Sequence, residues 1–302
     1  MRRMALLGAA VALPLMSCMQ EPARDADSVA PREFVSDRIS VVTRGTGPDI
    51  ILIPGLASHR DVWAAVGDTL DNRYRLHLVQ VNGFAGDAPG ANANGDVAAP
   101  VTEEIARYVR ETDLEQPAVI GHSMGGTIGM MLAARHPGRV GRLMVVDMTP
   151  YMGVMFGPSA STPEGLRAIA DQTRDTILAQ PVGSGTSMLE QMFSGMTRVP
   201  TMRSALLQYV RDSHRPTVAN AMREIIVTDM RPELTRINVP VRVLYVYPSN
   251  LPISSAEFDA GVRQSWSGLS GVQLVKIDGS NHFIQVDQPA RFVTEVDAFM
   301  RR

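Results

Sequence analysis

Cysteine is nearly absent from this sequence of 302 residues, since Cys18 is the only one. A single cysteine cannot form an internal disulfide, so no disulfide framework holds the fold. Neither sign of charge dominates, because 29 basic and 31 acidic residues leave a formal net charge of −2. This balance gives no electrostatic argument for a nucleic-acid partner. Internal repeats are missing, and beyond the N-terminus no apolar run is long enough to span a membrane. What remains is one large globular domain, or a core with an insertion.

The first residues have the pattern of an export signal. Two arginines precede an apolar run from Met4 to Met16, which is shorter than the about 20 residues that span a bilayer. Cys18 follows Leu15-Met16-Ser17, an arrangement that resembles a bacterial lipoprotein signal. We therefore predict a lipoprotein-type signal peptide over residues 1–18, with lipidation of Cys18. A plain secretory signal with an incidental cysteine is the alternative.

Residues 19–34 are polar and contain two prolines, which predicts a tether between membrane and folded domain. The predicted protein is exported, anchored in the membrane through an N-terminal lipid, and faces the periplasm. Met19 gives no inner-membrane retention signal, so the outer membrane is favoured.

Strand and helix patterns alternate along the rest of the chain. Strand patterns cover residues 39–42, 49–53, 75–81, 117–121, 143–146, 241–247 and 272–277. Helical spacings cover residues 61–70, 101–109, 124–135 and 289–300. This alternation predicts βαβ crossovers and a mainly parallel sheet.

Residues 150–235 interrupt the alternation, because they have helical spacings, many methionines and no clear strand. We predict a helical cap over this interval, inserted into a core of residues 35–149 and 236–302. The alternative is that these residues belong to surface helices of the core.

The stretch Gly121-His122-Ser123-Met124-Gly125 lies where a strand pattern becomes a helix pattern. A Gly-x-Ser-x-Gly sequence gains force in this context, because a sharp strand-to-helix turn crowds the serine and its neighbours. Glycine relieves the crowding, and the following helix directs free N–H groups toward developing negative charge. Ser123 is the predicted nucleophile.

An oxyanion at this nucleophile needs two hydrogen-bond donors. The backbone N–H of Met124, the residue after the serine, is one candidate. The N–H of Leu56 is the other, in the Pro54-Gly55-Leu56 loop that follows the 49–53 strand. Losing one such donor typically costs about 3 kcal/mol of transition-state stabilisation.

The base must be one of six histidines. His282 follows the last strand pattern and so lies at the carboxyl edge of the sheet, where Ser123 also lies. We predict that His282 is the general base. The side chain of His122, inside the Gly-x-Ser-x-Gly turn, is expected to point away from that of Ser123.

Taken together, these motifs resemble the α/β-hydrolase superfamily over about residues 38–301. The matching pieces are Leu52-Ile53-Pro54-Gly55 with Trp63, Val81-Asn82-Gly83-Phe84, Gly121 to Gly126, His136-Pro137-Gly138-Arg139-Val140, and His282-Phe283 before Asp287-Gln288-Pro289. The resemblance implies a mostly parallel, eight-stranded sheet flanked by helices. It also implies a helical cap and a chain order of nucleophile, acid and histidine.

The acid is the point of departure from this family. The loop after the 241–247 strand, where the family usually carries its acid, has no carboxylate in Pro248 to Pro252. Some members move the acid to the end of the preceding strand, and Asp147 occupies that position here. The alternatives are a loop-capping role for Asp147, an acid from Glu257 or Asp259 folding back, and a Ser–His pair oriented by Ser249 or Asn250.

A serine nucleophile with an oxyanion site indicates acyl transfer followed by hydrolysis. We predict a carboxylic ester hydrolase for small-molecule esters that forms an acyl-enzyme on Ser123. Neither metal-ligand spacing nor a phosphate-binding loop is found, so no cofactor is implied. The alternatives are a carbon–carbon bond hydrolase or lactonase of the same fold, and a catalytically weakened binding protein.

The cap sequence favours an adaptable apolar pocket, with cap core packing as the alternative for each residue. The residues concerned are Met152, Met155, Phe156, Met188, Met192, Phe193 and Met196.

Overall fold

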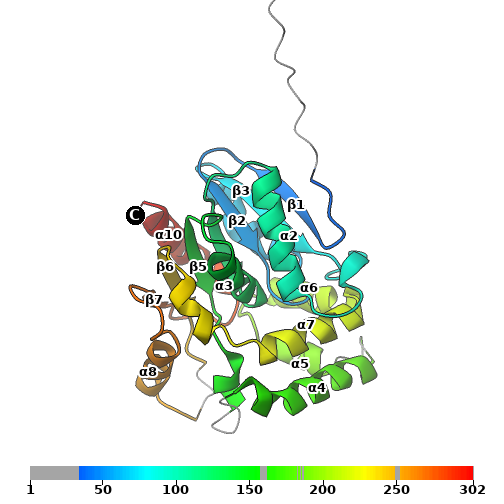
Figure 1. The fold of residues 1–302 in the computed structure, drawn as a ribbon. Helices are drawn as coiled ribbons and strands as arrows, with labels where there is room; N and C mark the ends of the chain where they lie inside the picture. The colour runs from blue at the N-terminus through cyan, green and yellow to red at the C-terminus, as the bar shows by residue number, and fades with distance from the viewer. Residues whose placement is uncertain are drawn as a thin grey trace, which may run out of the picture. The chain divides into compact units, whose positions relative to one another are not determined.

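A seven-stranded sheet forms the centre of the protein (Figure 1). The computed structural model describes residues 34–156, 162–181, 183, 185, 187–248 and 252–301. Phe34–Arg302 form one compact unit. The predicted signal peptide with Cys18, and the predicted tether except its last residue, lie outside the described residues.

The strands follow the order β1-β3-β2-β4-β5-β6-β7 across the sheet. They are β1 (Ile39–Arg44), β2 (Asp49–Ile53), β3 (Arg75–Val81), β4 (Ala118–His122), β5 (Arg142–Val146), β6 (Val241–Tyr245) and β7 (Gln273–Lys276). β1 pairs antiparallel with β3, and all other neighbours are parallel. The expectation of eight strands is wrong for the described chain, because a single antiparallel strand precedes β2 and forms the edge. The count of seven agrees with the strand patterns in the sequence.

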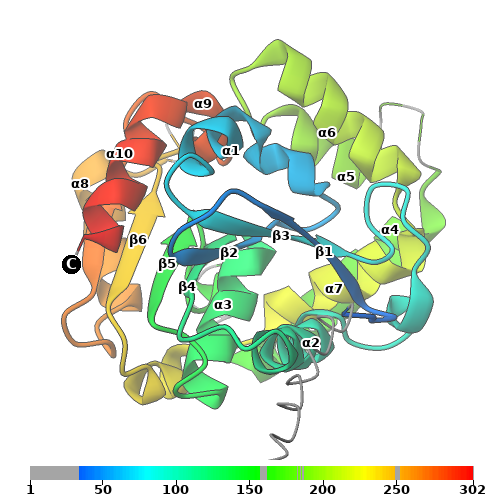
Figure 2. The same cartoon turned by 90° about the horizontal axis from the view of Figure 1, so that it is seen from above.

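Helices cover both faces of the sheet (Figure 2). α1 (Ala64–Leu70), α9 (Ile284–Asp287) and α10 (Pro289–Met300) lie on one face, and α2 (Ala98–Glu111) and α3 (Met124–Arg135) lie on the other. Strands buried on both sides need continuous apolar runs, and Ile50 to Ile53 of β2 are fully buried. The short 3₁₀ helices η1 (Arg60–Trp63) and η2 (Gly90–Asn92) lie in the loops after β2 and β3.

The chain between β5 and β6 is helical. It contains η3 (Met152–Phe156), α4 (Pro163–Ala179), α5 (Met188–Ser194), α6 (Pro200–Asp212), α7 (Arg215–Val227) and η5 (Arg231–Arg236). α4 and α7 pack side by side (Figure 1). The turn between α6 and α7 contacts the loop that follows β3, since His214 N–H donates to the carbonyl of Gly83 over 2.7 Å. These helices therefore reach the carboxyl edge of the sheet.

A buried carboxylate connects the cap to the core. Glu224 of α7 accepts hydrogen bonds from the backbone N–H groups of Val97 and Ala98 (2.6 Å each) and Ala99 (2.8 Å). These groups begin α2 and have no acceptor inside the helix. Burial raises the pKa of the Glu224 carboxyl, although the three donors act in the opposite direction. Glu224 thus serves as an N-terminal cap supplied by another element.

The sequence pattern did not predict two helices outside the cap, α8 (Ser255–Ser265) and the four-residue α9. α8 connects β6 to β7, and its apolar stripe is only partly buried. It begins with a capping box, in which Ser254 and Glu257 bond reciprocally to each other's backbone N–H. The sequence signal was Ser254-Ser255-Ala256-Glu257.

Candidate active site

Ser123 occupies a strained turn between β4 and α3. Its φ of 53° and ψ of −123° are sparsely populated for a residue with a side chain. A Cβ on Gly121 would lie 2.0 Å from the carbonyl oxygen of Gly125, and a Cβ on Gly125 would lie 2.3 Å from that of Ile53. Neither position has room for a side chain, which confirms the crowding predicted from the sequence.

The Ser123 hydroxyl lies at the N-terminus of α3 without capping it. Ser123 is the N-cap residue, yet its side chain makes no capping hydrogen bond. The N–H groups of Gly126 and Thr127 donate to the carbonyl of Ser123 (2.7 and 3.3 Å), whereas those of Met124 and Gly125, at the start of the helix, have no acceptor within α3. This end of the twelve-residue helix favours negative charge beside the serine.

Asp147 and His282 are in direct contact. His282 Nδ1 lies 2.6 Å from Asp147 Oδ2, and the other carboxylate oxygen accepts the backbone N–H of Val246 over 3.1 Å. Asp147 follows β5 with a φ of +50°, and its N–H donates to the carbonyl of Leu244 on β6. The structure therefore brings together the predicted base and one of the candidate acids at the carboxyl edge of the sheet.

The other candidate acids have different partners. Glu257 caps α8, and Asp259 bonds the hydroxyl of Tyr245 (3.1 Å) and Nζ of Lys276 (2.7 Å). The alternative of Glu257 or Asp259 folding back to His282 is wrong, because α8 holds both carboxylates elsewhere. Ser249 and Asn250 lie outside the described residues.

His282 is held beside the turn that carries Ser123. Its backbone carbonyl oxygen lies 3.0 Å from Nε2 of His122, and the two imidazole rings are 4.5 Å apart between centroids. His122 directly precedes Ser123 in the chain. The ring of Phe283 packs on the ring of His122, with 4.4 Å between the centroids. Aromatic contacts therefore extend from the loop of His282 to the turn of Ser123.

The loop with the predicted oxyanion donor packs against the same turn. A Cβ on Gly55 would lie 3.1 Å from Cβ of Ser123, so glycine allows this close approach. Leu56 is buried, and its carbonyl accepts the hydroxyl of Ser58 over 3.1 Å. Ala57 has a φ of +49°, so the loop turns sharply after Leu56. Gly55 and Met124 are therefore neighbours of Ser123 from two different elements, and the predicted donor Leu56 follows Gly55 directly in the chain.

The loop that carries His282 is also tied to the cap. Asp287 accepts the Thr197 hydroxyl (2.6 Å) and the N–H groups of Arg198 (2.9 Å) and Asn281 (2.7 Å). Phe283 N–H donates to the carbonyl of Met196, in the same linker between α5 and α6. Sequence reasoning assigned Asp287 no role, and its signal was only its position just before the C-terminal helix.

Burial keeps the pKa of two histidines low. His122 is fully buried, and burial together with the neighbouring His282 puts its pKa well below the usual range. Burial also lowers the pKa of His77, which contacts Asp49 (2.8 Å) and the hydroxyl of Tyr108 (2.6 Å). The remaining histidines have local partners: His59 with Asp61, His136 with Glu103 and His214 with Thr217.

The methionine-rich cap residues separate into three groups. Phe193 is 2% exposed and belongs to the core. Met155 and Phe156 are 73% and 39% exposed. Met152, Met188, Met192 and Met196 are partly buried and pack against the core. Phe193 therefore fits the alternative interpretation, in which the residue packs in the core of the cap and does not line a pocket.

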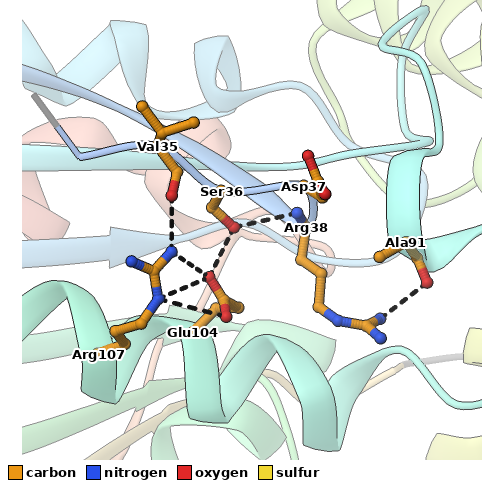
Figure 3. Close-up of a pocket in the computed structure, with 7 residues that line it drawn as sticks. All are labelled: Val35, Ser36, Asp37, Arg38, Ala91, Glu104 and Arg107. Carbon is orange, nitrogen blue, oxygen red and sulfur yellow. Dashed lines mark hydrogen bonds and ion pairs between the residues drawn. The ribbon is translucent and has the colours of Figure 1, made fainter.

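Two surface cavities lie away from the candidate catalytic residues. One of about 350 Å³ lies beside α2, where Arg107 donates hydrogen bonds to Glu104 (2.8 Å) and to the carbonyl of Val35 (2.7 Å) (Figure 3). The other, of about 510 Å³, lies at the junction of α6 and α7. Neither is lined by Ser123, Asp147 or His282. The polar groups of the first cavity bond one another and fasten the start of the described chain to α2.

The part of the chain that the structure describes has neither a cluster of metal ligands nor a membrane-spanning helix. Nowhere in the described residues do three or more His, Cys, Asp or Glu side chains converge as metal ligands. No helix in this part of the chain combines the length and the apolarity needed to cross a membrane.

Comparison with known proteins gives a consistent family. A family model described as alpha/beta hydrolase fold matches residues 48–289. A pimeloyl-acyl-carrier protein methyl ester esterase of Nitrosomonas europaea is 27% identical over 267 residues, which cover 86% of this chain and 98% of the relative. The protein of the same name from Vibrio cholerae is 24% identical over 266 residues, covering 85% and 93%.

Solved structures agree in fold. The enol-lactonase from Burkholderia xenovorans LB400 superposes with a TM-score of 0.71 at 17% identity, covering 87% of this chain and 96% of that one. An esterase from Exiguobacterium antarcticum gives 0.70 at 18% identity with the same coverage.

Proposed function

Because the chain belongs to the alpha/beta hydrolase fold family, we propose that it hydrolyses carboxylic esters through an acyl-enzyme on Ser123. The observation that carries this proposal is the 2.6 Å contact between Asp147 and His282, beside the strained turn of Ser123. The relatives from Nitrosomonas and Vibrio, named as methyl ester esterases, support the same class of reaction.

The first half of the reaction forms the acyl-enzyme. Ser123 Oγ attacks the ester carbonyl carbon while Nε2 of His282 takes the hydroxyl proton. The hydrogen bond from Nδ1 to Asp147 fixes the tautomer of this histidine and stabilises its positive charge. The backbone N–H groups of Leu56 and Met124 bind the oxyanion. The carbon–oxygen bond then breaks, and His282 gives its proton to the leaving alcohol.

The second half releases the acid. A water molecule attacks the acyl-enzyme carbonyl, and His282 takes its proton. The bond to Ser123 breaks, and the serine oxygen recovers a proton from His282. Asp147 remains ionised throughout, since it only accepts a hydrogen bond.

The alternatives rest on weaker arguments. A lactone is a cyclic ester and would be opened by the same steps, and carbon–carbon bond hydrolysis would use the same serine. The argument for a catalytically weakened binding protein is that the loop at the family's usual acid position contains no carboxylate. The contact of Asp147 with His282 supports an acid at a different position and weighs against that alternative.

The test combines labelling and kinetics. A fluorophosphonate probe is expected to label the wild-type protein and not Ser123→Ala, whereas Ser265→Ala, a change on exposed α8, should label normally. Ser123→Ala and His282→Ala should each lower kcat for p-nitrophenyl esters by about 10⁴- to 10⁶-fold.

The double variant should be scarcely slower than either single variant, because the two side chains act as a unit. A wild-type serine that never labels would favour a binding protein. Additive losses would assign the base to another residue. Esters of short and long acids, lactones and β-diketones in one panel would separate the three substrate classes.

A further inference from the structure

His122 connects the nucleophile turn, the loop of the base and the loop of the predicted oxyanion donor. It precedes Ser123 in the chain, and its Nε2 lies 3.0 Å from the carbonyl oxygen of His282, 160 residues further on. Its other nitrogen, Nδ1, faces the oxyanion loop, because a Cβ on Gly55 would lie 3.1 Å from that atom. The side chain is fully buried, so these contacts are shielded from water.

The contact with His282 fixes the chemical form of His122. A carbonyl oxygen can only accept, so Nε2 of His122 carries the hydrogen and donates it. Nδ1 then has a lone pair, and it has no hydrogen-bond partner among the described residues. Burial and the neighbouring imidazole lower the pKa of His122 well below the usual range, so this ring stays neutral. A neutral ring adds no positive charge 4.5 Å from the ring that must accept the proton.

Asp147 and His122 hold His282 at different points. Asp147 bonds the ring at Nδ1, which sets the rotation of the imidazole. His122 bonds the backbone carbonyl, which sets the position of the loop relative to β4. Proton transfer needs heavy atoms within about 3 Å, and a displacement of about 1 Å can cost 100-fold in rate. The contacts of Asp287 and Phe283 tie this loop to the cap, and the His122 hydrogen bond ties it directly to the strand that ends at the Ser123 turn.

We propose that His122 is a positioning residue for hydrolysis, whose Nε2–H hydrogen bond to the His282 carbonyl holds the base within reach of Ser123. This inference rests on the proposed function, because it assigns His282 as the base. His122 itself touches no substrate and transfers no proton.

The test uses substitutions that separate the donor from the ring. In His122→Gln the side-chain amide nitrogen can occupy the place of Nε2 and keep the donor. In His122→Phe an aromatic ring remains, but the donor is lost and the His282 carbonyl keeps only the N–H of Ile284, at 3.2 Å. The control is Ile120→Val, a change at a fully buried position on the same strand that removes one methylene and leaves every residue of the site unaltered.

We expect His122→Phe to lower kcat by about 10- to 100-fold, with KM changed by less than about twofold. His122→Gln should recover kcat to within about threefold of the wild type, and Ile120→Val should leave it unchanged. All rates are taken per folded molecule. In the proton NMR spectrum, the low-field signal of the His282–Asp147 hydrogen bond should weaken in the Phe variant and return in the Gln variant.

Three outcomes would overturn the inference. One is a Phe variant as fast as the wild type. Another is equal slowing in the Gln and Phe variants, which would assign the effect to packing. The third is an unaltered low-field proton signal in a slow Phe variant. If Ser123→Ala kept its activity, the proposed function would fail first, and that result is distinguishable from the other three.

Discussion

Asp147 combines two requirements in one side chain. One carboxylate oxygen accepts the N–H of Val246, as a loop-capping residue does, and the other contacts Nδ1 of His282. Loop capping and orientation of the base, which are alternatives in the sequence analysis, are therefore compatible. A substitution can still separate the two roles. The amide of asparagine keeps one oxygen acceptor and replaces the other carboxylate oxygen with an NH₂ donor.

Asp147→Asn is expected to lower kcat by about 10³- to 10⁴-fold with little loss of thermal stability. The amide oxygen can still accept from Val246, but the amide nitrogen would face Nδ1 and favour the tautomer that cannot take the serine proton. Steady-state kinetics and melting temperature measure the two effects.

The control for this change is Asp297→Asn on α10, where the carboxylate bonds Tyr74 (3.0 Å) and Arg73, away from the site. It should lower stability and leave kcat unchanged. A large loss of stability with an unchanged rate in Asp147→Asn would make Asp147 a loop cap alone.

Between elements, two carboxylates are among the groups that join the cap to the core. Glu224 caps α2 from α7, and Asp287 joins the His282 loop to the linker between α5 and α6. Both carboxylates accept several N–H or O–H donors, and charged acceptors make stronger hydrogen bonds than neutral ones. The cap therefore contributes to the position of the base loop as well as covering the sheet.

Glu224→Gln is expected to destabilise the protein by about 1–3 kcal/mol, measured by urea unfolding at neutral pH. The amide nitrogen cannot accept, so at least one N–H at the start of α2 would lose its partner in a buried position. The favourable interaction of the negative charge with the helix N-terminus would also be lost.

Glu164→Gln is the matched control, since Glu164 lies in the first turn of α4 and is exposed. It should change the free energy of unfolding by less than about 0.5 kcal/mol. Equal effects of the two changes would contradict the capping role of Glu224.

For the whole molecule, the buried histidines predict how stability depends on pH. Burial lowers the pKa of His122 and of His77 in the folded state. The unfolded chain binds protons at these residues near pH 6.5, while the folded protein does not until the pH is lower. The unfolded state therefore holds more protons in this window. Stability is fully present above about pH 6.5 and falls as the pH decreases below it.

Removing one of these histidines should flatten that dependence. In His122→Gln the slope of unfolding free energy against pH, between about pH 6.5 and 5, should decrease by up to about 1.4 kcal/mol per pH unit. Ile120→Val should lower the stability at every pH and keep the slope. Urea unfolding at a series of pH values measures both, and an unchanged slope in His122→Gln would mean that His122 is protonated in the folded protein.

The predicted lipid anchor is tested at Cys18, which lies outside the described residues. In a bacterial host, the wild-type protein should incorporate labelled fatty acid, and the labelled protein should sediment with the outer membrane. Cys18→Ala should take up no label and appear as a soluble or unprocessed form, whereas Ser123→Ala should be lipidated normally. Failure of the wild-type protein to take up label would favour a plain secretory signal.

The order of the elements and the form of the nucleophile turn follow from local patterns in the sequence. Strand and helix patterns depend on the spacing of apolar residues within short segments. The glycines around Ser123 were predictable because the crowding they relieve arises within a few residues, at Gly121 and Gly125. Helical spacing did not reveal α8, because its inward stripe is short, with Phe258 and Val262 one turn apart and only partly buried.

The carboxylate that meets His282 could not be identified from local patterns, because Asp147 lies 135 residues away in the chain and long-range packing brings the two together. Parallel pairing of β5 with β6, and of β6 with β7, brings the ends of those strands to one edge, whereas the turn into α8 carries Glu257 and Asp259 away. The contact between His122 and His282, 160 residues apart, has the same origin. Such contacts depend on sheet order and loop path, which local patterns do not encode.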